Sequence, residues 1–61
     1  MNGMQYLNEF AHRGYDVETR TDTSEDAKKN GCIRLTKCFQ DSGWLKTWEE
    51  ALAWTDKQIA R

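Results

Sequence analysis

The feature that most constrains this chain is the segment 43–59, which holds all three tryptophans and the strongest helix signal. Thr47 followed by Glu50 three residues later is a capping box, which predicts a helix that begins at Thr47. The apolar positions of this helix recur at helical spacing, so we expect them to form one stripe that faces a core. This stripe comprises Trp48, Ala51, Leu52, Thr55 and Ile59.

The first third of the chain predicts one helix and one strand. Asn2 and Gln5 form a second capping box, and apolar residues keep helical spacing up to Gly14, which predicts a helix over residues 3–13. Its apolar positions are Met4, Leu7, Phe10 and Ala11. In residues 15–21, tyrosine, valine and threonine then alternate with charged residues, as in a strand with one buried face.

The middle of the chain predicts a loop and two more strands. Residues 22–31 contain no apolar residue except Ala27, so we expect a flexible loop or a single helical turn that contributes nothing to a core. Residues 32–39 alternate as an amphipathic strand. The apolar residues on its core face are Ile33, Leu35 and Phe39. The sequence Asp-Ser-Gly at 41–43 predicts a turn, which leaves residues 44–45 as a short third strand.

These elements predict a single α+β domain over residues 1–61. The connections are short enough to make the three strands antiparallel neighbours. Each helix has one apolar stripe, and the economical packing lays both stripes on the same sheet face. We therefore expect a two-layer sandwich of order α-β-β-β-α, with a three-stranded antiparallel sheet and both helices on one face.

Composition argues against several classes of function. Ten acidic and nine basic residues give a net charge of -1, which removes the bulk attraction expected of a protein that binds nucleic acid or anionic membranes. No stretch approaches the about 18 apolar residues of a membrane span, and the N-terminus lacks the features of a signal peptide. We expect a cytoplasmic protein, either a monomer or a weak homodimer, with no membrane partner.

The residues that carry chemistry are few and poorly spaced for it. Two cysteines and one histidine are too few for a four-ligand metal site. His12 projects from the polar side of its helix, away from any partnership with Cys32 or Cys38. The two cysteines would lie about 20 Å apart in one strand, so we expect free thiols. The sequence thus predicts no enzyme, no cofactor and no metal.

The candidate binding residues are those that the expected core does not use. Trp54 lies about 120° from Trp48 around its helix, so it either covers the edge of the core or anchors an interface. Tyr6 has the same ambiguity. The sheet face away from the helices carries charges of opposite sign that pair across the strands or meet a partner. The candidate partner-binding residues are Trp54, Gln58, Tyr6, Arg20 and Arg34.

The order helix, three strands, helix, with Leu7-Asn8-Glu9 in the first helix and Tyr15 opening the first strand, resembles the double-stranded-RNA-binding domain. The resemblance covers most of the chain in topology and only these residues in motif. In that family a lysine-rich helix start meets the RNA phosphates, whereas this chain has Trp48-Glu49-Glu50 there. The resemblance implies nucleic-acid binding as an alternative function. It would require a basic patch to assemble from Lys28, Lys29, Arg34 and Lys37.

The function that these observations favour is binding of a protein partner. Short chains without catalytic equipment are often encoded by phages and mobile elements, where they modulate or inhibit a host protein. We therefore expect a small protein-binding module of this accessory type. Nucleic-acid binding and a purely structural or interaction role remain the alternatives.

Overall fold

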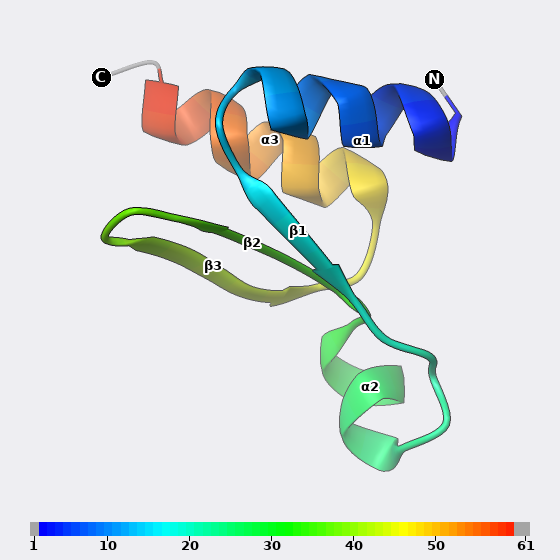
Figure 1. The fold of residues 1–61 in the computed structure, drawn as a ribbon. Helices are drawn as coiled ribbons and strands as arrows, with labels where there is room; N and C mark the ends of the chain where they lie inside the picture. Colours follow the sequence, from blue (N-terminus) through cyan, green and yellow to red (C-terminus); the bar gives the residue numbers. More distant parts are fainter. Residues whose placement is uncertain (1, 60–61) are drawn as a thin grey trace.

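The computed structural model describes residues 2–59, which form three helices and a three-stranded sheet (Figure 1). In chain order the elements are α1 (Gly3–His12), β1 (Asp16–Thr19), α2 (Glu25–Asn30), β2 (Ile33–Lys37), β3 (Gln40–Leu45) and α3 (Trp48–Ile59). The sheet has the order β1-β2-β3, and both strand pairs are antiparallel. The predicted α+β class and antiparallel sheet are confirmed.

The core lies between the helices α1 and α3 and one face of the sheet. In Figure 1 the two helices lie side by side on one side of the strands, and they contact each other along their length. They run in the same direction, because Tyr6 stacks on Trp48 near their first turns, and Arg13, after the end of α1, reaches Thr55 farther along α3. The buried core residues are Tyr6, Phe10, Tyr15, Ile33, Leu35 and Ala51.

Both predicted capping boxes are present, the second in a modified form. The Asn2 side chain accepts from the amide of Gln5 at 3.0 Å, and the Gln5 side chain accepts from the amide of Asn2 at 2.8 Å. The Thr47 hydroxyl accepts from the amide of Glu50 at 3.1 Å, as expected. The Glu50 carboxylate, however, accepts from the amide of Lys46 rather than from that of Thr47. Thr47 is therefore the cap, and α3 begins one residue later.

The apolar stripe predicted for α1 is wrong for three of its four members. Phe10 is fully buried, but Met4 is 68% exposed, and Leu7 and Ala11 also face solvent. Tyr6 is buried instead. The reason is aromatic packing, since Tyr6 and Phe10 lie one turn apart and both stack on Trp48 of α3. The ring centroids of Tyr6 and Phe10 lie 6.0 and 6.2 Å from that of Trp48.

The stripe predicted for α3 is right in its first two turns and fails at its end. Ala51 and Thr55 are fully buried, and Trp48 and Leu52 are half-buried against the core. Ile59, in contrast, is 58% exposed. The helix α1 ends at His12, so no part of it extends far enough to cover Ile59.

The turn between β2 and β3 is not where the sequence placed it. Lys37 pairs with Gln40, so the turn consists of residues 38–39, and β3 begins at Gln40. The expected turn residues 41–43 lie inside β3, where the register shifts and Ser42 Oγ accepts from the amide of Leu35 at 2.9 Å. Ser42 and Gly43 therefore lie in a β-bulge rather than in a hairpin turn.

The segment expected to be a loop or a single helical turn contains the short helix α2, which has six residues. The Ser24 hydroxyl caps it by accepting from the amide of Ala27 at 3.1 Å. Ala27 is 2% exposed, so this segment does bury one apolar residue, although Ala27 lies outside the main core cluster, to which the segment was expected to contribute nothing. Gly31 ends the helix at a φ of 116°, packed against the backbone of Leu45.

The two cysteines lie at opposite ends of β2. Cys32 directly precedes the strand and is half-buried, whereas Cys38 follows it in the turn and is exposed. Both are free thiols. Within residues 2–59, no helix has the length and apolar character needed to cross a membrane.

Candidate functional site

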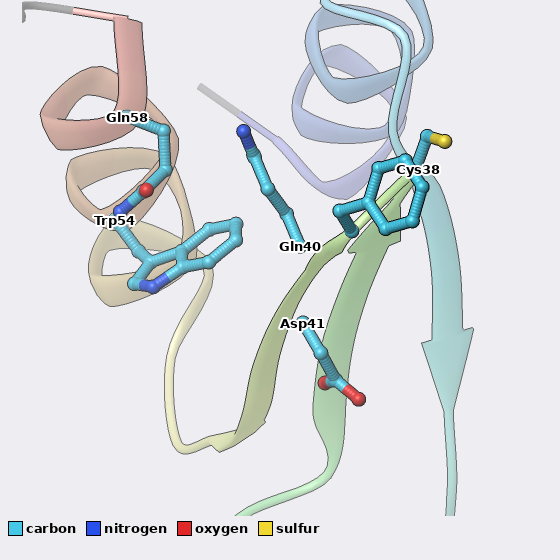
Figure 2. A pocket seen from close by; sticks show the side chains of 6 residues that line it. Cys38, Gln40, Asp41, Trp54 and Gln58 are labelled. Carbon is cyan, nitrogen blue, oxygen red and sulfur yellow. The ribbon is translucent and has the colours of Figure 1, made fainter.

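A hollow lies between the β2–β3 hairpin and α3. Cys38, Gln40 and Asp41 come from the hairpin, and Trp54 and Gln58 come from α3 (Figure 2). Phe39 completes the lining. Figure 2 shows the Trp54 ring reaching from α3 toward the Gln40 side chain, so the two elements meet across this hollow.

Phe39 is the most exposed large apolar residue in the described part of the chain. Its relative exposure is 103%, so its ring has no packing role in the fold. Its φ is 63°, in the left-handed region, and it is the second residue of a two-residue turn, where glycine or asparagine is usual. A left-handed conformation costs a residue with a Cβ about 1–2 kcal/mol. The hairpin tip thus carries an apolar side chain at some cost to stability.

Trp54 is partly buried and lines two hollows. Its ring meets that of Tyr15 edge to face, with centroids 5.5 Å apart, and it packs against the core. The hollow on the hairpin side is described above, and the second hollow lies between α3 and the end of β3. The residues that line the second hollow are Leu45, Glu50, Ala53, Trp54 and Lys57. The partial exposure predicted for Trp54 is therefore confirmed.

The polar groups of the first hollow are ordered by hydrogen bonds behind it. The Tyr15 hydroxyl donates to Gln40 Oε1 at 2.5 Å, which leaves the amide NH2 of Gln40 as its remaining polar group. Asp41 accepts two hydrogen bonds from Arg34 and one from the amide of Gly43 at 2.9 Å. Arg34 and this amide together lower the pKa of Asp41 to about 2. The hollow therefore has the NH2 group of Gln40, the amide of Gln58 and a carboxylate that is already paired.

The sheet face away from α1 and α3 is occupied by internal ion pairs. Arg34 lies between Glu18, with 3.8 Å between the charged atoms, and Asp41, which it contacts through two N–H groups. These carboxylates raise the pKa of Arg34, with Asp41 the larger cause. The cross-strand pairing expected on this face is confirmed. The charge of Arg34 is balanced by two carboxylates within the chain.

Arg20 has a role in joining α2 to the sheet. Its guanidinium lies 3.9 Å from the centre of the Trp44 ring, donates to the carbonyl of Gly31 at 3.0 Å and pairs with Asp26 at 2.7 Å. Arg20 and then Asn30 lower the pKa of Asp26 through their hydrogen bonds. Arg20, a candidate partner-binding residue, thus makes these contacts with Trp44, Gly31 and Asp26 of its own chain.

The remaining candidate residues do not gather at one place. Tyr6 is buried between α1 and α3 and lies away from the hairpin. Lys28 and Lys29 are on α2, before β2, whereas Lys37 ends β2 and donates to the carbonyl of Arg13 at 3.1 Å. The basic residues required by the nucleic-acid alternative are therefore divided between the two ends of β2. Of the five candidates, Trp54 and Gln58 line one hollow, whereas Arg20 and Arg34 lie next to Trp44 on the sheet.

Phe39 and Gln40 are site residues that sequence reasoning missed. Phe39 follows the alternation of β2, which assigned it to the core, and no glycine, asparagine or proline marks the turn at residues 38–39. A turn here could not be found from local residue preferences. Within residues 2–59, no group of three or more histidine, cysteine, aspartate or glutamate side chains is placed to hold a metal ion.

Comparison of the chain with protein-family models, with curated protein sequences and with solved structures gives no match.

Proposed function

We propose that this chain is a non-enzymatic module that binds a protein partner through the surface between the β2–β3 hairpin and α3. We call this the hairpin–α3 surface. The residues that define it are Phe39, Gln40, Trp54 and Gln58. The observation that carries the proposal is the fully exposed ring of Phe39, which is held in a left-handed turn and lines the same hollow as the partly exposed Trp54.

Two aromatic residues on one small surface are the usual anchors of a protein interface. Aromatic side chains are enriched among the residues that dominate binding free energy. The Phe39 ring loses no intramolecular contact when a partner covers it, because it makes none that buries it. Trp54 is held by Tyr15 from behind, so little side-chain entropy is lost on binding. These features support a preformed interface.

The alternative of nucleic-acid binding has less support. Arg34 is paired with two carboxylates, and Lys37 lies at the opposite end of β2 from Lys28 and Lys29. Neutralisation of several phosphates by clustered basic residues is what gives nucleic-acid binding its affinity and its dependence on salt. The accessory role typical of phage and mobile-element proteins, including inhibition of a host protein, belongs to this same proposal.

The test is capture of a partner from a lysate of the native cells, with and without nuclease. Phe39→Gly and Trp54→Ala should each abolish capture at moderate salt, and nuclease should leave capture by the unaltered chain unchanged. Met4→Ala removes another exposed apolar side chain, from α1, and serves as the control. Capture that survives both hairpin–α3 substitutions but disappears with nuclease, or with Lys28→Ala and Lys29→Ala, would show that the proposal is wrong.

A further inference from the structure

We infer that the outer edge of β1 takes an extended segment of another protein as an added strand, and that this segment carries basic side chains at alternate positions. The inference goes beyond the proposed function, because β1 contributes no residue to the hairpin–α3 surface. β1 and β3 are the two edges of the sheet (Figure 1). Strand addition gains affinity from main-chain hydrogen bonds and specificity from alternate side chains. Both must therefore be present on the β1 edge.

The backbone of β1 has unpaired groups at every second residue. Arg20 donates to the carbonyl of Cys32 at 3.0 Å, and the antiparallel register then places Glu18 in the next hydrogen-bonded pair with β2. The N–H and C=O groups of Val17 and Thr19 consequently point away from β2. No turn or loop backbone within residues 2–59 bonds to them. Val17 and Thr19 each offer one donor and one acceptor to a partner strand.

The opposite edge of the sheet does not have this regularity. In β3 the register shifts opposite Leu35, and Gly43 has a φ of 68°. The amide of Gly43 donates to Asp41, and its carbonyl accepts from the Ser42 hydroxyl at 2.7 Å. Strand addition needs free backbone groups along a regular edge. The edge that meets this requirement is therefore β1.

The side chains of β1 that face away from the helices are acidic. Asp16 and Glu18 are both exposed. Asp16 forms no ion pair within residues 2–59, and Glu18 lies 3.8 Å from Arg34, which has Asp41 as its nearer carboxylate. Residues of an added strand opposite Asp16 and Glu18 would form non-hydrogen-bonded pairs, in which side chains approach most closely. Lysine or arginine there would be stabilised, whereas an acidic residue would be repelled.

The other face of the same edge selects the intervening partner residues. Val17 is half-buried and packs against the core, and Thr19 is exposed beside it on the helix side. Partner residues opposite Val17 and Thr19 would lie on this side of the sheet. β-branched side chains suit such a half-buried, pleated surface. The partner segment is therefore one in which basic and β-branched residues alternate.

A second copy of this chain does not fit the edge. In a two-fold antiparallel pair, residues on the same sheet face lie opposite each other. Registers that pair residues 16–18 or residues 17–19 with themselves place Glu18 opposite Asp16 or opposite the other Glu18. Like charges directly opposite each other are destabilising. Charge thus favours a different, basic chain as the occupant.

The test is a titration of the whole chain with the peptide Lys-Thr-Lys-Val-Lys-Thr-Lys, followed by the backbone amide resonances of Val17 and Thr19. We expect saturable shifts of both amides and slower exchange of their protons with solvent, because binding places them in hydrogen bonds. The same peptide with N-methyl groups on its threonines and valine keeps the charge but loses the donors for β1. The peptide Glu-Thr-Glu-Val-Glu-Thr-Glu keeps the donors and reverses the charge. Neither control should shift these amides.

Matched variants test the role of the carboxylates. Asp16→Asn combined with Glu18→Gln should weaken binding of the lysine peptide about fivefold. Glu25→Gln combined with Glu49→Gln makes the same change in net charge at exposed positions on α2 and α3 and should leave the affinity unchanged. Circular dichroism checks the fold of each variant. If the β1 variant does not fold, the comparison of the three peptides on the unaltered chain decides the matter.

Several outcomes would overturn the inference. They are the absence of saturable shifts at about 1 mM lysine peptide, equal binding of the N-methylated peptide, and equal binding of the glutamate peptide. A dimer of the chain alone that protects the amides of Val17 and Thr19 would also overturn it, because a second copy would then occupy the edge. Phe39→Gly should leave binding of the lysine peptide unchanged. Failure of this inference therefore leaves the proposed function of the hairpin–α3 surface standing.

Discussion

The guanidinium of Arg13 donates a hydrogen bond of 2.8 Å to the hydroxyl of Thr55, joining the end of α1 to the middle of α3. Thr55 is fully buried, and its hydroxyl donates in turn to the carbonyl of Leu52 at 2.8 Å. Arg13 also pairs with Glu9 at 3.0 Å and with Asp56 at 2.5 Å. A polar residue at a core position is thus satisfied by a cation from the neighbouring helix.

Replacement of Thr55 should show how much this connection contributes. Thr55→Val keeps the shape of the side chain but removes the acceptor for Arg13, so we expect the free energy of unfolding to fall by about 1–2 kcal/mol. Urea unfolding measures this difference. Thr23→Val, at an exposed position, is the control and should have little effect. Equal stability of the Thr55 variant and the unaltered chain would mean that the bond contributes nothing.

Two glycines separate the effect of close packing from that of a left-handed backbone. A Cβ at Gly31 would lie 2.1 Å from the carbonyl oxygen of Leu45, at a φ of 116°, so Gly31→Ala should cost about 3 kcal/mol or more. Gly43 has a φ of 68° and open space around it, so Gly43→Ala should cost only about 1 kcal/mol. Thermal unfolding of the two variants tests this order. Similar losses for both would contradict it.

Acid should weaken the fold through Asp41. Its pKa is lowered from 3.8 to about 2, first by Arg34 and then by the amide of Gly43. A carboxyl group with a lowered folded pKa contributes its full stability above its unfolded pKa, and this is lost as the pH falls through the folded value. We therefore expect stability to decline between about pH 4 and pH 2. Asp41→Asn should flatten this part of the profile, measured by urea unfolding at each pH; an unchanged profile would exclude Asp41 as its source.

Phe39→Gly should stabilise the isolated chain. Glycine adopts the left-handed turn without steric cost, and the exposed Phe39 ring contributes no burial that would be lost. The greater entropy of glycine in the unfolded chain offsets part of this gain, so we expect at most about 1 kcal/mol of added stability. Thermal unfolding measures it, with Phe10→Ala as a contrast that removes a buried ring at a cost of about 3–5 kcal/mol. A clear loss of stability in Phe39→Gly would reveal a structural role for the ring.

The sequence predicts the fold where local chemistry and tertiary packing require the same arrangement. The Asn2 and Thr47 caps are correct because a capping side chain bonds only to its own first turn. Ile33 and Leu35 are buried because strand alternation leaves a single way to face the helices. These signals suffice for the helices α1 and α3 and for the antiparallel sheet.

Prediction from the sequence fails where two local signals compete, or where a neighbouring element determines which residues are buried. The residues Asp41, Ser42 and Gly43 favour a turn, but they form a bulge instead because Ser42 can satisfy the amide of Leu35. On α1, Met4 fits the helical period as well as Tyr6 does, and only the position of Trp48 selects Tyr6 for burial. Neither outcome is encoded within one segment.

The candidate site was only half predictable for the same reason. Trp54 and Gln58 follow from their angular position on a well-marked helix. Phe39 does not, because its exposure depends on the hairpin turning at residues 38–39 rather than at the expected residues 41–43. The sequence therefore identifies the site residues on α3 but not the site residue in the β2–β3 turn.

The parallel pairing of α1 with α3 also determines when the chain can fold. Phe10 and Tyr6 are covered by Trp48 and Ala51, which are among the last residues of the described chain to be made. The helix α1 contacts β1 and α3, so a ribosome must synthesise the chain past α3 before the core around Tyr6 and Phe10 is complete. Contacts between residues so distant in sequence form slowly. Folding of this domain should be a late, concerted event rather than a stepwise one along the emerging chain.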